Sequence, residues 1–193
     1  MSSREGRARP MPPDARQAEI IAAVTPLVVA HGRDVTSRQL AEAAGVAEGT
    51  VFRAFGDKET LLRRVVEAYF DPEPFRRDLR AVDRDRPLID VLTDVISLLR
   101  ERFAHMFRMV AAMGERPAPP SSLDDFIAIL TELLGDDTRR LRLPVSEVAQ
   151  VIRMVSFSSV LPGVATEQTQ DPRRLAEIVL YGVANRPDPT EPE

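Results

Sequence analysis

The sequence predicts an all-α protein. Apolar residues recur at spacings of three and four, glycine and proline separate the periodic segments, and no segment shows the sustained alternation typical of a strand. Apolar residues make up 44% of the 193 residues, which is enough for a packed core. There is no cysteine, and the two histidines, His31 and His105, are far apart. A disulfide framework, a thiolate zinc site and a cysteine nucleophile are therefore excluded.

Nine helices follow from the apolar spacing and from the residues that start and stop helices. They are predicted over residues 14–31, 37 to Gly45, 47–54, 58–70, 75–83, 88–113, 123–134, 144–161 and 172 to about 185. Thr36 and Gln39 form a capping box before the second helix, and Asp57 caps the fourth. Pro26 lies inside the first helix, where it removes a backbone hydrogen bond and predicts a kink or a 3₁₀ stretch.

The net charge differs between the N-terminal third of the chain and the rest. Residues 1–64 hold ten Lys and Arg against eight Asp and Glu, whereas residues 65–193 hold sixteen against twenty-two. The N-terminal part therefore suits a polyanionic partner better than the rest. Lys58 is the only lysine, and it stands at the start of the fourth predicted helix. A cation there opposes the helix dipole, which makes sense if an anion is expected nearby.

Residues 37–56 fit a helix-turn-helix. Leu40 and Ala41 supply the apolar and small residues where two helices cross, and Gly45 supplies the positive φ that the turn needs. The second helix is anchored by Val46, Val51 and Phe55. Its outward residues are then Glu48, Gly49, Thr50, Phe52, Arg53 and Ala54. A helix held in this way can enter the major groove of DNA.

Residues 36–62 resemble the sequence signature of the TetR family of transcriptional regulators. Three pieces carry the resemblance: Ala44-Gly45-Val46 at the turn, Gly49-Thr50-Val51-Phe52 on the recognition helix, and Phe55-x-x-Lys58-x-x-Leu61 leading into the fourth helix. The resemblance implies an N-terminal three-helix DNA-binding domain and a larger C-terminal helical domain that binds a ligand and dimerises.

DNA contacts are expected at nine positions: Thr36, Ser37, Arg38, Glu48, Gly49, Thr50, Phe52, Arg53 and Lys58. The family's lysine contacts the DNA backbone, and we carry this role over to Lys58. Arg53 and Glu48 are the candidates for base edges, guanine and cytosine respectively. An arm in the minor groove is expected from Arg4, Arg7 and Arg9. Phe52 stands where the family usually has tyrosine, and Ala47 where a serine usually caps the recognition helix.

Flexible thioethers and aromatic rings in the C-terminal part suit an apolar effector pocket. Its candidate residues are Phe103, Met106, Phe107, Val110, Met113, Phe126, Leu130, Met154 and Phe157. The last two helices suit a dimer interface, because helix 144–161 is apolar around much of its circumference. The candidates there are Val148, Ile152, Val155, Ser159, Leu175, Ile178, Val179 and Gly182.

The expected organisation is a disordered basic arm (1–13), a DNA-binding domain (14–56), a connecting helix (57–71), an effector and dimerisation domain (72–186) and a disordered tail (187–193). The implied function is that of a homodimeric regulator, a repressor that an unknown small apolar effector releases from double-stranded operator DNA. A constitutive or architectural DNA-binding protein without effector and a protein-binding helical adaptor remain alternatives.

An enzyme is not expected, because the chain has no histidine–carboxylate constellation and no glycine-rich phosphate loop. No cofactor and no metal ion are expected either. The apolar runs are too short to cross a membrane, and the first residues carry no apolar leader segment. A cytoplasmic location is therefore predicted.

Overall fold

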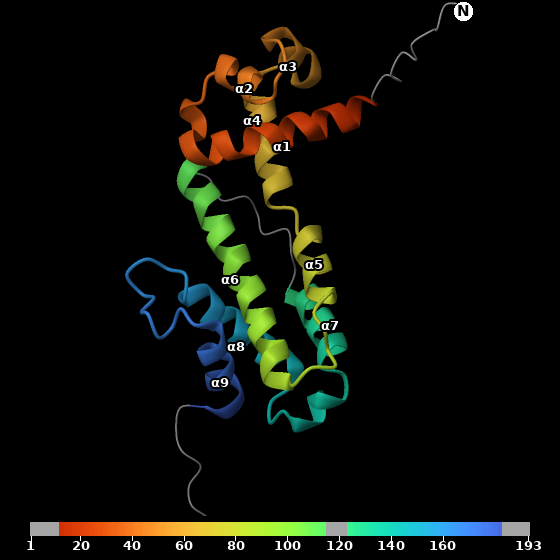
Figure 1. Ribbon diagram of the computed structural model, residues 1–193, viewed down its shortest axis with the longest axis vertical. Coiled ribbons are helices and arrows are strands. Elements are labelled where there is room, and N and C mark those ends of the chain that lie inside the picture. The colour runs from red at the N-terminus through yellow and green to blue at the C-terminus, as the bar shows by residue number, and fades with distance from the viewer. Residues whose placement is uncertain (1–11, 115–122, 183–193) are drawn as a thin grey trace, which may run out of the picture. The chain divides into compact units, whose positions relative to one another are not determined.

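The computed structural model describes residues 12–114 and 123–182, and all regular structure within these ranges is helical, as predicted (Figure 1). The α-helices are α1 (Pro13–His31), α2 (Ser37–Ala43), α3 (Glu48–Phe55), α4 (Lys58–Tyr69), α5 (Glu73–Arg80), α6 (Leu88–Met113), α7 (Leu123–Leu134), α8 (Val145–Ser158) and α9 (Pro172–Tyr181). Two 3₁₀ helices follow α1 and α7, η1 (Gly32–Asp34) and η2 (Gly135–Arg140). The expected arm with Arg4, Arg7 and Arg9 and the expected tail 187–193 lie outside the described residues.

Most helix bounds fall within two residues of the predicted ones, but α1 differs in character. It is α-helical from Pro13 to His31, so the predicted 3₁₀ stretch at Pro26 is wrong. Pro26 leaves the carbonyl oxygen of Ala22 without its usual helical donor. Both residues lie on the exposed side of the helix, where water can satisfy that oxygen. The helix therefore continues as an α-helix through the proline with one backbone hydrogen bond fewer, and the alternative of a kink stays a prediction.

The described residues form two compact units, and the first comprises residues 12–71 together with residues 107–114. Its centre is α1, which contacts α2, α3 and α4. The buried side chains of α1 and α4 are Ile20, Val24, Val28, Leu61, Leu62, Val65 and Tyr69. The last two turns of α6 belong to this unit, and they contribute the buried Met109 and Met113.

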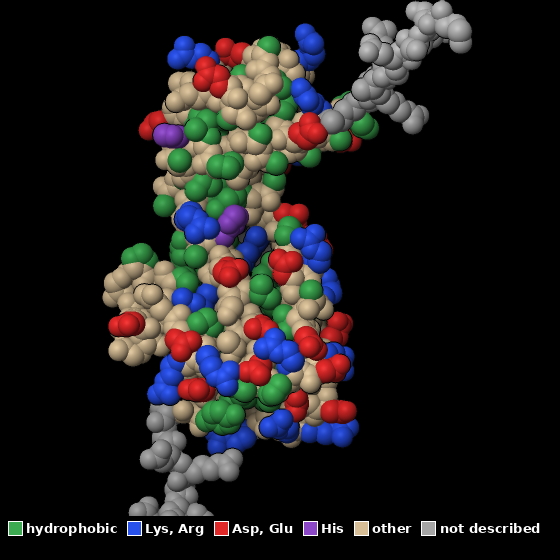
Figure 2. Space-filling view, viewed as in Figure 1, with side chains coloured by type: hydrophobic (Ala, Val, Ile, Leu, Met, Phe, Trp, Pro, Cys, Tyr) green, Lys and Arg blue, Asp and Glu red, His purple; other side chains and the backbone are tan. Residues whose placement is uncertain are grey.

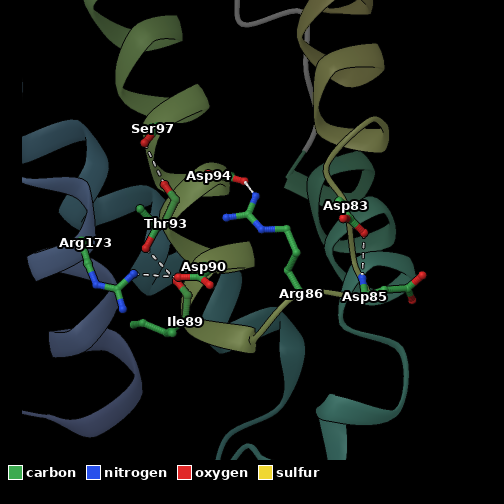
Figure 3. A network of polar contacts seen from close by, with 9 residues as sticks. All are labelled: Asp83, Asp85, Arg86, Ile89, Asp90, Thr93, Asp94, Ser97 and Arg173. Carbon is green, nitrogen blue, oxygen red and sulfur yellow. Dashed lines mark hydrogen bonds and ion pairs between the residues drawn. The ribbon is translucent and has the colours of Figure 1, made fainter.

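The second unit comprises residues 72–106 and 123–182. Its apolar core draws side chains from α5, α6, α7, α8 and α9, among them Leu79, Leu92, Ile96, Leu130, Ile152 and Leu175. At the start of α6, Asp90 Oδ1 accepts a hydrogen bond from Arg173 Nη1 at 2.7 Å, which ties α9 to α6 (Figure 3). Arg86, just before α6, donates from Nη1 to Oδ2 of Asp94 on that helix at 2.6 Å. These polar contacts stabilise the start of α6 at the edge of the apolar core.

Arg100 joins the middle of α6 to the end of α8. Its Nη1 atom donates to the carbonyl oxygens of Ser159 and Thr169, at 3.2 and 3.4 Å, and to the Ser159 hydroxyl. Partial burial lowers the pKa of the guanidinium, while Asp171 acts in the opposite direction. Because the terminal carbonyls of a helix carry partial negative charge, the cation sits favourably there. Arg100 therefore holds the α8–α9 connection against α6.

Gly32, which directly follows α1, lies close to the last turn of α6. It is buried and has φ +56°, and a Cβ built on it would lie 2.0 Å from the carbonyl oxygen of Ala112. Any side chain at this position would both strain the backbone and collide with α6. The last turn of α6 can occupy its place in the first unit only because residue 32 is glycine.

Replacing Gly32 with alanine tests this contact, with Gly45→Ala as a matched control. Gly45 also has a positive φ, +63°, but a Cβ there would meet nothing within 4 Å. Both variants lose about 1–3 kcal/mol from the backbone conformation. Only Gly32→Ala adds a steric clash, so its free energy of unfolding in urea should fall clearly further. Equal losses in the two variants would contradict the contact.

Candidate nucleic-acid interface

The capping box at the start of α2 is present as predicted. Gln39 N donates to Thr36 Oγ1 at 3.3 Å, and Thr36 N donates back to Gln39 Oε1 at 2.8 Å. The Thr36 hydroxyl also donates to Gln39 Oε1 at 2.9 Å, so both of its hydrogen-bonding roles are engaged within the chain. Leu40 and Ala41 are the buried residues of this helix. The first helix of the motif is therefore fixed before any DNA is met.

The turn between α2 and α3 depends on Gly45, whose φ is +63°. Gly45 N donates to Glu42 O at 3.1 Å, and Val46 N donates to Ala41 O at 3.0 Å. These bonds close the end of α2 and direct the chain into α3. The predicted helix-turn-helix thus has the backbone conformation that its sequence requires.

Helix α3 is anchored on one side and open on the other. Val51 and Phe55 are buried, and Gln17 Nε2 of α1 donates to the carbonyl oxygen of Ala54 at 2.7 Å. The exposed residues of α3 are Glu48, Gly49, Phe52 and Arg53, whereas Thr50 is only partly exposed. Arg38 is exposed on α2, where its Nε lies 3.8 Å from Glu42 Oε1. Figure 2 shows charged side chains of both signs around α2 and α3.

The N-terminus of α3 has no side-chain cap. Its N-cap residue is Ala47, and Thr50 N bonds to the backbone carbonyl of Ala47 at 2.8 Å. Backbone N–H groups at a helix start carry partial positive charge, which favours phosphate oxygens or other acceptors. The structure thus confirms the prediction that α3 begins without a side-chain cap.

Lys58 has a partner within the chain that the sequence did not reveal. Its Nζ atom donates to the carbonyl oxygen of Arg33, in η1, at 2.8 Å. Arg33 Nη1 in turn lies 2.9 Å from Glu59 Oε2. These contacts hold the start of α4 against the segment that follows α1. An ammonium has three protons, so this bond leaves two donors for a phosphate.

Sequence reasoning missed Gln17, Arg33 and Glu59, which position the motif from elsewhere in the chain. Each bond joins residues at least 25 positions apart. Hydrophobic periodicity and capping patterns report only local neighbours, so they carry no signal for such contacts.

The predicted pocket residues are divided between the two units. Phe107, Val110 and Met113 belong to the first unit, and the other six belong to the second. Within the second unit, Phe126 and Leu130 are part of the core, whereas Met154 is 63% exposed. Phe103 and Phe157 pack edge to face with ring centroids 5.3 Å apart. The pocket stays a prediction.

Most of the predicted interface residues face the chain's own core. Val148, Ile152 and Leu175 belong to the buried cluster of the second unit, and Ser159 is buried against Arg100. Val155 and Val179 are partly buried beside that cluster, Ile178 is partly buried, and Gly182 is exposed. Because α8 is apolar on two sides, the sequence could not tell which side the chain covers itself.

The open side of α8 is apolar too. Val151, Met154 and Phe157 follow one another at intervals of three residues and are exposed by 38, 63 and 38%. Tyr181, at the end of α9, is 71% exposed.

Among the described residues, no helix is both long and apolar enough to cross a membrane.

The fold and the geometry of α2 and α3 define a helix-turn-helix DNA-binding protein. Residues 20–65 match the sequence model of the bacterial regulatory proteins of the tetR family. Residues 20–65 thus form a helix-turn-helix DNA-binding domain of the tetR family type.

Solved structures share the fold at low sequence identity. A TetR transcriptional regulator from Streptomyces coelicolor is 19% identical, with a TM-score of 0.55 over 86% of this chain and 97% of that one. The fatty acid degradation regulator FadR from Bacillus halodurans is 18% identical, with a TM-score of 0.55 over 92% and 100%. A transcriptional regulator from Rhodococcus is 17% identical, with a TM-score of 0.51 over 88% and 92%. No curated protein matches the sequence.

Asp57 offers a test of the start of α4. Its Oδ1 accepts the backbone N–H of Thr60 at 2.7 Å, and this hydrogen bond is the main reason why the pKa of Asp57 is lowered. A carboxyl with a lowered folded-state pKa stabilises the protein above its unfolded-state pKa, and this contribution is lost as the pH falls through the folded-state value. Asp57→Asn keeps a cap but has no charge to titrate. We expect the stability advantage of the wild type over Asp57→Asn to shrink steadily as urea unfolding is repeated from pH 6 to pH 3. An advantage that does not change with pH would refute the role of the charge.

Proposed function

We propose that the protein is a homodimer that binds a two-fold operator through α3 and leaves it when a small apolar compound binds the second unit. We also propose that the protein has no enzymatic activity. The observation that carries the proposal is the open face of α3. Glu48 and Arg53 are exposed there, and neither makes a hydrogen bond or an ion pair with any residue in the ranges 12–114 and 123–182. Charged groups so placed on an anchored helix suit contacts with base edges.

Positioning on the DNA backbone would come from the ends of the motif. Arg38 is exposed at the start of α2, Ser37 is partly exposed beside it, and Lys58 keeps donors free at the start of α4. Contacts of this kind fix register and carry no sequence information of their own. Thr36 would contribute through the capping box, since its hydroxyl is already engaged.

A salt series tests operator binding and the role of Lys58 together. Binding of the purified protein to the duplex upstream of its own gene is followed by fluorescence anisotropy, with a scrambled duplex as control. Lys58→Gln removes the charge but keeps a donor for Arg33. We expect its salt slope to be smaller by about 0.9 per protomer, hence by about 1.8 for a dimer.

The matched control is Arg77→Gln, because Arg77 is 77% exposed on α5 and lies in the other unit. Its slope should equal that of the wild type. Equal affinity for both duplexes would favour the architectural alternative. A slope that changes as much in Arg77→Gln as in Lys58→Gln would remove Lys58 from the interface.

The second copy is proposed to cover the open side of α8. Exposed apolar patches of this kind mark interaction sites, and an isologous contact uses one patch twice. Val151, Met154 and Phe157 lie on one side of α8, and Tyr181 ends α9. This surface differs from the one predicted from sequence, and it needs no rearrangement of the chain's own core.

Met154→Asp is expected to weaken the dimer at least tenfold, because each copy would bury an unpaired carboxylate. Sedimentation equilibrium measures the dissociation constant. Leu143→Asp is the matched control, since Leu143 is 48% exposed just before α8 and outside the proposed surface. A dimer that tolerates Met154→Asp as well as Leu143→Asp would place the interface elsewhere.

Release by an effector is proposed from the apolar character of α6 and from its course through both units. Residues 88–106 of α6 belong to the second unit and residues 107–113 to the first. A compound that alters the packing of α6 in the second unit would thereby favour another conformer of the dimer, and by linkage operator and effector would weaken each other's binding. The proposal fails if no member of a panel of fatty acids, steroids and aromatic compounds weakens operator binding.

A further inference from the structure

The outward face of α3 carries four chemically different elements side by side. With about 100° between successive residues of an α-helix, Glu48, Phe52, Gly49 and Arg53 follow one another around the helix within roughly 140°. All four are exposed, and the buried Phe55 and Val51 follow beyond Glu48, where the helix turns toward the core. The face thus offers a carboxylate, an apolar ring, a bare stretch of backbone and a guanidinium.

No contact among residues 12–114 and 123–182 explains why residue 49 is glycine. Its φ is not positive, and a Cβ built on it would meet nothing within 4 Å in these ranges. Glycine destabilises a helix relative to alanine, so the residue carries a cost that no contact in the described part of the chain requires. A bare position at the centre of an exposed face does make sense if that face must come very close to another surface.

Phe52 has no hydrogen-bonding group, yet its side chain is 40% exposed. It lies one turn after Gly49 and between Glu48 and Gly49 around the helix. The edges of base pairs in the major groove are polar except for the C5-methyl group of thymine. That methyl group is the one feature of the groove floor that a phenyl ring can recognise.

We propose that Phe52 reads a thymine methyl group in each operator half-site, and that Gly49 leaves the space for α3 to approach it. The proposal rests on α3 entering the major groove, as proposed above. Arg53 lies beyond Gly49 on this face of α3, so we expect it to contact a guanine near that thymine. Glu48 lies at the opposite edge of the face, where it favours contact with a cytosine amino group. Phe52 recognises the thymine through van der Waals contact alone, because its ring lacks the hydroxyl group of the tyrosine that is usual at this position.

Replacing thymine with deoxyuridine removes only the methyl group and tests the contact directly. A consensus duplex is first selected with the wild-type protein from a randomised library. Each thymine is then replaced in turn, and affinities are measured for the wild type, Phe52→Ala and Phe52→Leu. We expect one thymine per half-site at which deoxyuridine weakens wild-type binding about fourfold, or about 15-fold when both half-sites are changed.

Phe52→Ala should bind thymine and deoxyuridine equally, and Phe52→Leu should keep part of the preference. The inference is overturned if the wild type ignores the methyl group at every thymine, or if Phe52→Ala shows the same loss as the wild type. Failure to enrich any sequence would overturn operator binding itself, so the two failures are distinguishable.

Gly49→Ala separates a role in DNA approach from a role in folding. We expect its thermal midpoint to equal or exceed that of the wild type, because alanine favours the helix. Its affinity for the consensus duplex should nevertheless fall about tenfold or more, as α3 is held away from the groove. A variant that is more stable and binds equally well would show that nothing approaches this position.

Discussion

The close contact between Gly32 and the carbonyl oxygen of Ala112 is the constraint on which the first unit depends. It brings the last turn of α6 into the same compact unit as the helix-turn-helix. Helix α6 begins among the core residues of the other unit and is uninterrupted over 26 residues. Residues of α6 therefore contribute to both units, and a backbone contact that only glycine permits holds its last turn in the first unit.

Hydrogen bonds near Gly32 hold the helices of the helix-turn-helix in position. The segment after Gly32 is held by Lys58, which donates to Arg33 and thereby sets the start of α4. Helix α1, which ends just before Gly32, also holds the end of α3, because Gln17 donates a hydrogen bond to the carbonyl oxygen of Ala54. The open face of α3 thus rests on a frame of hydrogen bonds and buried side chains, which is the preorganisation that specific recognition needs.

The sequence predicted what local rules govern. The capping box at Thr36, the positive φ of Gly45 and the buried Val51 of α3 are each set by residues a few positions apart, and all three are confirmed. It could not predict the contact of Gly32 with Ala112 or the bond of Lys58 with Arg33, because these partners are far apart in the chain. Nor could it choose between the two apolar sides of α8, since hydrophobic periodicity does not distinguish a side covered by the chain from one left open.

The measurement that tests the central claim most directly is methylation interference on the selected operator. Dimethyl sulfate modifies guanine N7 in the major groove and adenine N3 in the minor groove, and modified positions that block binding are mapped on both strands. If two copies of α3 occupy the major groove, interference should appear at guanine N7 in two clusters about 10–10.5 base pairs apart. Interference at a single cluster, or only at adenine N3, would contradict the account.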